Sequence, residues 1–306
     1  MKTQALCVVI FAVVIVSCGK TVNQPFTGLF SGEITPSVGG GSGGGGNGSS
    51  GIQILSTATM TSASKSPVAV GNLIYDGTRL IVIDTIGGWP INNTVTFDYI
   101  STNLTLQSHS TASYNAGVWA TVTAPGPLAG QTAVYWAEYG STSTHLTVRD
   151  DASGTIQSTT AINFSNYGCS GNTTFTYCGG DYYGVCTTSS GYMRLFSCDT
   201  SGTMQSAVTT NIATTTDTPN AVTCYNGSYL LLVTSHDSGS YSAFYKYDLN
   251  FNLMATDSRA SASFPPGLQT VVGIATDGTN LYLQGVNNSA NPPTYMLGVA
   301  TLGNLK

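Results

Sequence analysis

The chain has 306 residues, of which 41% are hydrophobic and only 8% are charged, with a net charge of −5. Disordered chains combine high charge with few aromatic residues, so 17 Tyr and 10 Phe argue against that class. The nine Lys and Arg residues are scattered and form no basic stripe, which argues against a nucleic-acid partner. The abundance of Gly, Thr and Tyr favours β-structure with many turns.

Residues 1–17 are predicted to be a signal peptide. Lys2 precedes an uncharged apolar run from Ala5 to Val16, which has the length of a signal-peptide core and is too short to span a bilayer. The run ends in Ile15-Val16-Ser17-Cys18-Gly19, which resembles the lipobox of bacterial lipoproteins. The resemblance implies that Cys18 is lipidated and becomes the new N-terminus, so that its acyl chains anchor the protein to a membrane. The alternative is an ordinary secretory signal with an incidental cysteine.

Residues 18–51 are expected to be a tether between the lipid and a folded domain. The stretch 39–51 is almost entirely Gly, Ser and Asn, a composition typical of a flexible coil. A phosphate-binding loop would need a following Lys-Ser/Thr pair, and none is present. Gly19 stands where many inner-membrane lipoproteins have Asp, so the resemblance implies the outer membrane or the cell surface.

Residues 52–306 are predicted to form one repeat domain. The phrase at Thr105–Ser108 recurs at 155–158 and at 203–206, and a looser copy follows at 253–256. A fifth copy is missing near the end of the chain, but a matching segment is present at residues 52–57. We therefore expect an all-β fold, a five-bladed β-propeller of four-stranded blades, in which the N-terminal strand closes the ring and removes exposed edges.

Each unit carries four short strand signals separated by turn residues. The first unit has them at 68–75, 79–84, 94–99 and 104–109, with the hairpin signal Asp76-Gly77 after the first. Later units carry Gly179-Gly180, Asn226-Gly227 and Asp277-Gly278 at the same place. A β-helix would need much shorter repeats, and tandem sandwiches would need units about twice as long.

An Asp also recurs shortly before each fourth strand, at Asp98, at Asp150 or Asp151, at Asp199 and at Asp248. A ring of metal ligands or catalytic carboxylates would give this pattern. Asp side chains also cap tight turns by accepting hydrogen bonds from nearby backbone amides. Because the feature repeats, we predict the capping role.

Disulfides are expected in blade three, because an exported protein meets an oxidising compartment. The predicted pairs are Cys169 with Cys186 and Cys178 with Cys198, which leaves Cys224 as an unpaired buried thiol. Zinc is the alternative, but no His is nearby in the sequence and no close Cys pair occurs. We predict no metal and no cofactor.

Five-bladed propellers include many glycoside hydrolases, which need two carboxylates across the sugar bond. The candidates in this chain are Glu138, Asp84, Asp181, Asp217, Asp237 and Asp257. Their spacing does not single out a pair, and no nucleophile motif or metal-binding cluster accompanies them. Catalysis is therefore a lesser alternative.

Ligand binding is the preferred hypothesis. The connections from second to third strands, and from each fourth strand to the next blade, share one face of a propeller and are long here. They carry aromatic residues beside Asn and acidic residues, which is typical of a surface for a sugar or a peptide. The predicted ligand-binding residues are Trp89, Tyr114, Asn115, Glu138, Tyr139, Tyr167, His236, Asp237, Tyr241 and Asn287. The choice between glycan and protein stays open, and a scaffold for outer-membrane assembly is the alternative function.

Overall fold

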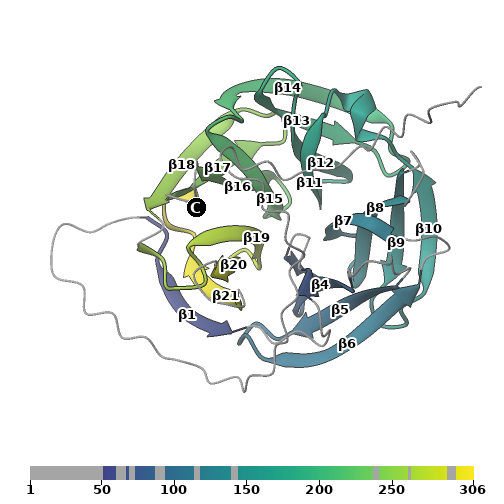
Figure 1. Ribbon diagram of the computed structural model, residues 1–306, viewed down its shortest axis with the longest axis horizontal. Helices are drawn as coiled ribbons and strands as arrows, with labels where there is room; N and C mark the ends of the chain where they lie inside the picture. Colours follow the sequence, from purple (N-terminus) through teal and green to yellow (C-terminus); the bar gives the residue numbers. More distant parts are fainter. Residues whose placement is uncertain are drawn as a thin grey trace, which may run out of the picture.

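The computed structural model describes residues 51–59, 67–68, 73–86, 94–113, 118–138, 144–236, 241–260, 263–287 and 294–306. Within these ranges five antiparallel sheets stand in a ring, each with its first strand near the axis and its last strand at the perimeter (Figure 1). The predicted five-bladed β-propeller is confirmed.

The blades follow one another along the chain. Blade one contains β2 (Pro67–Val68), β3 (Ile74–Tyr75), β4 (Leu80–Ile86), β5 (Thr94–Ile100) and β6 (Leu106–Ser113), where β2 and β3 both pair with β4. Blade two contains β7 (Val118–Pro125), β8 (Gln131–Glu138), β9 (Thr144–Asp150) and β10 (Ile156–Ala161). Blade three contains β11 (Gly171–Cys178), β12 (Asp181–Thr187), β13 (Tyr192–Cys198) and β14 (Met204–Ala213). Blade four contains β15 (Asp217–Tyr225), β16 (Tyr229–His236), β17 (Tyr241–Asp248) and β18 (Leu253–Ala260). Blade five contains β19 (Thr270–Thr276), β20 (Asn280–Asn287), β21 (Thr294–Thr301) and β1 (Ile54–Thr59). Two 3-10 turns, η1 (Phe164–Tyr167) and η4 (Gly303–Leu305), complete the described elements.

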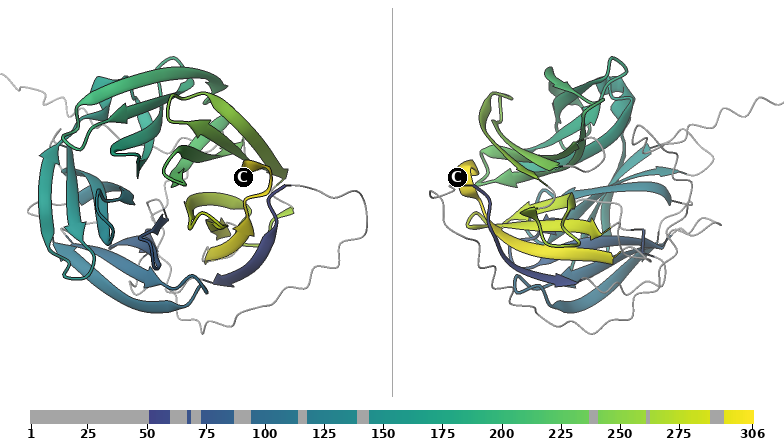
Figure 2. Two further views of the ribbon diagram at one scale, coloured as in Figure 1. Left: turned by 180° about the vertical axis from the view of Figure 1, so that it is seen from behind. Right: turned by 60° about the vertical axis from the view of Figure 1, so that its left-hand side comes forward.

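The N-terminal strand closes the ring, as the sequence predicts. β1 pairs antiparallel with β21, and Figure 2 shows this purple strand beside the yellow C-terminal strands. The backbone amide of Ile52 donates to the carboxylate of Asp257 on β18 at 2.8 Å, which also joins the closing segment to blade four. Ile52 itself is buried in the cluster that packs blade four against blade five.

The recurring sequence phrase marks a β-bulge at the start of every outermost strand. In blade two, Ile156 pairs with Arg149 and Ser158 with Val148, so that Gln157 is an extra residue without an opposite partner. The same shift occurs at the start of β6, β14, β18 and β1. The extra residue is exposed in each case: Gln107, Gln157, Gln205, Met254 and Leu55. The repeat therefore encodes a local backbone irregularity rather than a chemical site.

The core lies in the seams between neighbouring blades. The second strands are buried on both faces, which explains their continuous apolar runs. In blade four, Leu230 and Leu232 of β16 pack against blade three, whereas Leu231 and Val233 pack against blade five. This alternation means that each blade depends on both of its neighbours for burial.

Three of the four recurring Asp residues cap turns. Asp150, Asp199 and Asp248 each accept hydrogen bonds from backbone amides two to four residues further along the chain. The expectation for Asp98 is wrong: it is buried inside β5, opposite Val82 in the register. In blade one the hydroxyl of Ser101 caps the equivalent turn.

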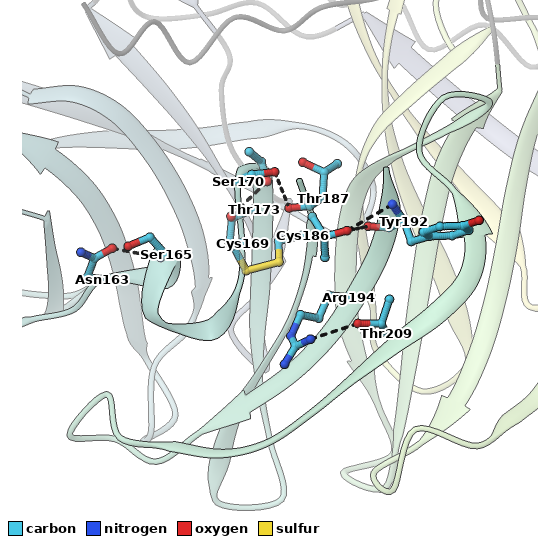
Figure 3. Close-up of a disulfide and its surroundings, with 12 residues drawn as sticks. Asn163, Ser165, Cys169, Ser170, Thr173, Cys186, Thr187, Tyr192, Arg194 and Thr209 are labelled. Atoms are coloured by element: carbon cyan, nitrogen blue, oxygen red, sulfur yellow. Dashed lines mark hydrogen bonds between the residues drawn. A yellow bond between two sulfur atoms is a disulfide. The ribbon is translucent and has the colours of Figure 1, made fainter. Parts of the chain in front are cut away.

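Two disulfides are present, and one of the two predicted pairs is correct. Cys169 is bonded to Cys186 within blade three (Figure 3). Cys178 is bonded to Cys224, so its predicted pairing with Cys198 is wrong. The reason is strand alternation: Cys178 faces blade four, whereas Cys198 is a buried free thiol on the side that faces blade two. The Cys178–Cys224 bond links the inner strands β11 and β15 of neighbouring blades.

The seam between blades one and two contains buried charge. The guanidinium of Arg149 on β9 lies 3.8 Å from the centroid of the Phe97 ring in blade one, and its Nη2 donates to the Ser110 hydroxyl at 3.0 Å. Asp151, two residues further along, is 4% exposed. Burial raises the pKa of the Asp151 carboxyl to about 6, against the smaller opposing effects of the Thr132 hydroxyl and of the Arg149 charge. The charged groups near Asp151 are Arg149, Asp76 and Arg79.

Removing residues 52–57 is expected to destabilise the whole ring, because blade five loses most of its outer strand and a buried Ile52. The thermal midpoint should fall by several degrees, since each kcal/mol corresponds to about 2–4 °C in a domain of this size. The matched control deletes six residues upstream, 44–49. Equal midpoints for the two deletions would contradict the closure mechanism.

The Asp151→Asn variant should change how stability depends on pH. Between the ordinary Asp pKa of 3.8 and about 6, folded Asp151 keeps a proton that the unfolded chain releases. The free energy of unfolding should therefore fall as the pH rises through this window, and the neutral Asn should remove that fall. At neutral pH we expect the variant to be about 1–2 kcal/mol more stable, with allowance for screening. Urea titrations from pH 4 to 7 measure this, and parallel curves for the two proteins would refute it.

Candidate functional site

Two connections of blades three and four meet on one face of the ring. Residues 188–191 join β12 to β13, and residues 214–216 lead from β14 into β15. The amide of Thr214 donates to the carbonyl of Gly191 at 2.9 Å and so ties the two connections together. The ends of β15, β16 and β17 lie beside them. We call this region the blade three–four face.

Two predicted ligand-binding residues are stacked on each other at this face. His236 is the last residue of β16 and Tyr241 is the first of β17, and the register of the hairpin places them opposite each other. Their ring centroids are 4.1 Å apart with an interplanar angle of 14°. The hairpin therefore presents a flat pair of rings near solvent.

Asp217 stands next to this stack. It is the first residue of β15 and pairs with His236 in the register. Its Oδ1 lies 3.6 Å from Nδ1 of His236 and accepts from the Thr234 hydroxyl at 3.4 Å. Its Oδ2 accepts from the Thr216 hydroxyl at 3.2 Å. The Asp217 side chain is 13% exposed and that of His236 is 26% exposed, so solvent still reaches both.

A second tyrosine, Tyr245, belongs to the same hairpin. Tyr245 lies four residues beyond Tyr241 on β17, on the same face of the strand. Burial raises the pKa of its phenol, and the negative charge of Asp217 raises it further. The described contacts of the carboxylate are thus the His236 ring and the hydroxyls of Thr216 and Thr234.

The sequence alone did not single out two residues of this face. Asp217 was only one of six candidate carboxylates, because its partner His236 lies on the next strand and one-dimensional spacing does not show the pairing. Tyr192 begins β13 and is 43% exposed beside the connection 188–191. An aromatic residue just after a Ser-rich loop is the only signal that could have identified it.

Other predicted residues have different outcomes. Tyr167 is buried, packs on Phe164 and Phe196, and donates its hydroxyl to the carbonyl of Gly202. Its predicted place on a ligand-binding surface is therefore wrong, because η1 turns the side chain into the seam with blade two. For Glu138 and Asn287 only the backbone is described, at the ends of β8 and β20. The remaining predicted residues lie outside the described ranges: Trp89, Tyr114, Asn115, Tyr139, Asp237 and Cys18.

The candidate carboxylates for hydrolysis do not converge where their side chains are described. Asp181 closes the tight turn opposite Cys178, at the other face of the ring. Asp257 accepts the hydrogen bond from Ile52. Only Asp217 lies on the blade three–four face, and the side chains of Asp84, Glu138 and Asp237 lie outside the described set. Among the described residues no group of His, Cys, Asp and Glu could hold a metal ion, and none of their helices could cross a membrane.

Comparisons with known proteins show the fold alone. No protein-family model matches the sequence, and no curated protein matches it. An exo-β-1,3-galactanase from Phanerochaete chrysosporium superposes with a TM-score of 0.53 at 11% identity, over 81% of this chain and 64% of that one. The glutaminyl cyclase of Myxococcus xanthus superposes with a TM-score of 0.52 at 12% identity, over 82% and 97%. The catalytic domain of a Coprinopsis cinerea GH62 α-L-arabinofuranosidase superposes with a TM-score of 0.53 at 9% identity, over 79% of this chain and 94% of that one. This chain therefore spans less than two thirds of the galactanase.

Proposed function

We propose that this protein is a lipid-anchored envelope protein that binds a glycan on the blade three–four face. The observation that carries the proposal is the stacked His236–Tyr241 pair with the Asp217 carboxylate beside it. Sugars present flat C–H surfaces and directional hydroxyl donors, and this arrangement offers a partly exposed ring surface next to a hydrogen-bond acceptor. The hydroxyls of Thr216 and Thr234 are already directed at the same carboxylate.

The fold comparisons favour a glycan over a protein ligand. Two of the superposed structures carry names that describe action on saccharides, a galactanase and an arabinofuranosidase. At about a tenth sequence identity such likeness supports a ligand class and no particular sugar. A protein ligand, including an outer-membrane assembly partner, remains the alternative that the binding experiment distinguishes.

The location rests on the N-terminal sequence and on the cysteines. The lipobox-like segment around Cys18 supports lipid anchoring. The bonds Cys169–Cys186 and Cys178–Cys224 support an oxidising compartment, because cytosolic proteins rarely keep disulfides. Each bond closes a loop and is expected to add roughly 3–4 kcal/mol of stability in the chain-entropy account.

The binding proposal predicts that Tyr241→Ala weakens glycan affinity by about fivefold or more, because truncation of a central aromatic residue costs at least ~1 kcal/mol. The wild-type domain is first screened on an array of soluble oligosaccharides, and the best binder is then titrated by calorimetry. Leu128→Ala, an exposed apolar residue in the turn between β7 and β8 on the opposite face, is the control. Equal affinity for the two variants would contradict the placement of the site.

The anchoring proposal predicts that Cys18→Ala moves the protein from the membrane fraction to the soluble fraction. Protease treatment of intact cells, with disrupted cells as the control, then reports orientation. Loss of the domain from intact cells places it at the cell surface, whereas survival until disruption places it in the periplasm and favours the scaffold alternative. A Cys18→Ala variant that stays in the membrane fraction would overturn lipid anchoring.

A further inference from the structure

We infer that the glycan bound at the blade three–four face carries protonated amines, as an amino sugar does. This inference rests on the proposed function and names the ligand class of the same site. It depends on the incompletely paired carboxylate of Asp217 and on the aromatic rings around it.

The hydrogen bonds of Asp217 are long in comparison with those of the other described carboxylates. Asp199 accepts from the Ser201 hydroxyl at 2.6 Å, and Asp248 accepts from the Asn252 amide at 2.8 Å. The contacts of Asp217 are 3.2, 3.4 and 3.6 Å, at or beyond the usual limit for a good hydrogen bond. A partly buried carboxylate gains most from a short, charge-assisted donor, and the side chains described around Asp217 do not supply one.

No permanent cation of the protein lies in the segments that form this face. The stretches 188–191, 213–217 and 236–241 contain no Lys or Arg in the sequence. Among the described side chains, His236 is the only group near Asp217 that could become positive. The positive charge that would balance the carboxylate can therefore come from the ligand. An acidic glycan would instead meet a like charge at Asp217.

The surrounding rings favour the same ligand class. An ammonium group is attracted to the face of an aromatic ring, by about 0.5–1 kcal/mol at exposed sites and more when water is excluded. Tyr241 stacks on His236, whose Nδ1 lies 3.6 Å from Asp217, and Tyr245 lies on the same face of β17 as Tyr241. A neutral hydroxyl gains a hydrogen bond from Asp217, whereas an ammonium gains the ion pair and the ring contact together. The blade three–four face thus discriminates by charge as well as by shape.

The test compares glucosamine hexamer, N-acetylglucosamine hexamer and galacturonic acid hexamer by calorimetry at neutral pH and low salt. The wild type should bind the glucosamine hexamer about tenfold or more tightly than the acetylated one, as a charge-assisted hydrogen bond implies. The acidic hexamer should bind more weakly than either. Asp217→Asn, which keeps the shape of the side chain, should bring the first two affinities together.

Asp199→Asn is the matched control, because it removes the same charge from a turn at the opposite face. It should keep the preference for the amine, and equal loss in both variants would show that net charge alone attracts the ligand and would overturn the inference. Equal binding of the two hexamers by the wild type would overturn the inference but leave the proposed glycan site standing. Failure of these hexamers and of every array glycan would overturn the proposed function together with this inference.

Discussion

The pairing of β1 with β21 is the constraint on which the rest of the structure depends. Each blade buries one face against the preceding blade and the other against the next, so the apolar second strands are stable only in a closed circle. The closing segment adds its own buried contacts, through Ile52 in the core cluster and through its amide on Asp257. Segments from both ends of the domain must therefore come together before the two seams beside blade five are complete.

Closure gives blade five its outer strand but leaves five outer strands open at the perimeter. Many proteins guard such edges with Lys or other charges. Only 8% of this chain is charged, so that protection is scarce. The bulge at the start of each outer strand supplies a second form of protection, because an extra residue twists the edge and interrupts pairing with a second molecule. The recurring sequence phrase is thus explained by the need to avoid pairing of the outer strands with a second molecule.

The features that could be predicted from sequence were those with a local or periodic cause. The blade period, the closing strand, the turn caps at Asp150, Asp199 and Asp248, and the Cys169–Cys186 bond follow from spacing and turn chemistry. The partner of Cys178 could not be found this way, because it depends on which face of a blade a side chain occupies. The predicted position of Tyr167 on a ligand-binding surface is wrong for the same reason. Asp217 and His236 are distant in sequence and meet only through the pairing of β15 with β16.

The seam between blades three and four differs at its two ends, and this difference bears on binding. At the end near the tight turn between β11 and β12, the Cys178–Cys224 bond joins the inner strands β11 and β15 covalently. At the opposite end of β15, Asp217 begins the strand beside the His236–Tyr241 stack. A strand locked at one end and hydrogen-bonded along its length holds its first residue in place, so little ordering is left for the ligand to impose. Affinity at such a site comes from the preformed carboxylate and rings rather than from loop closure.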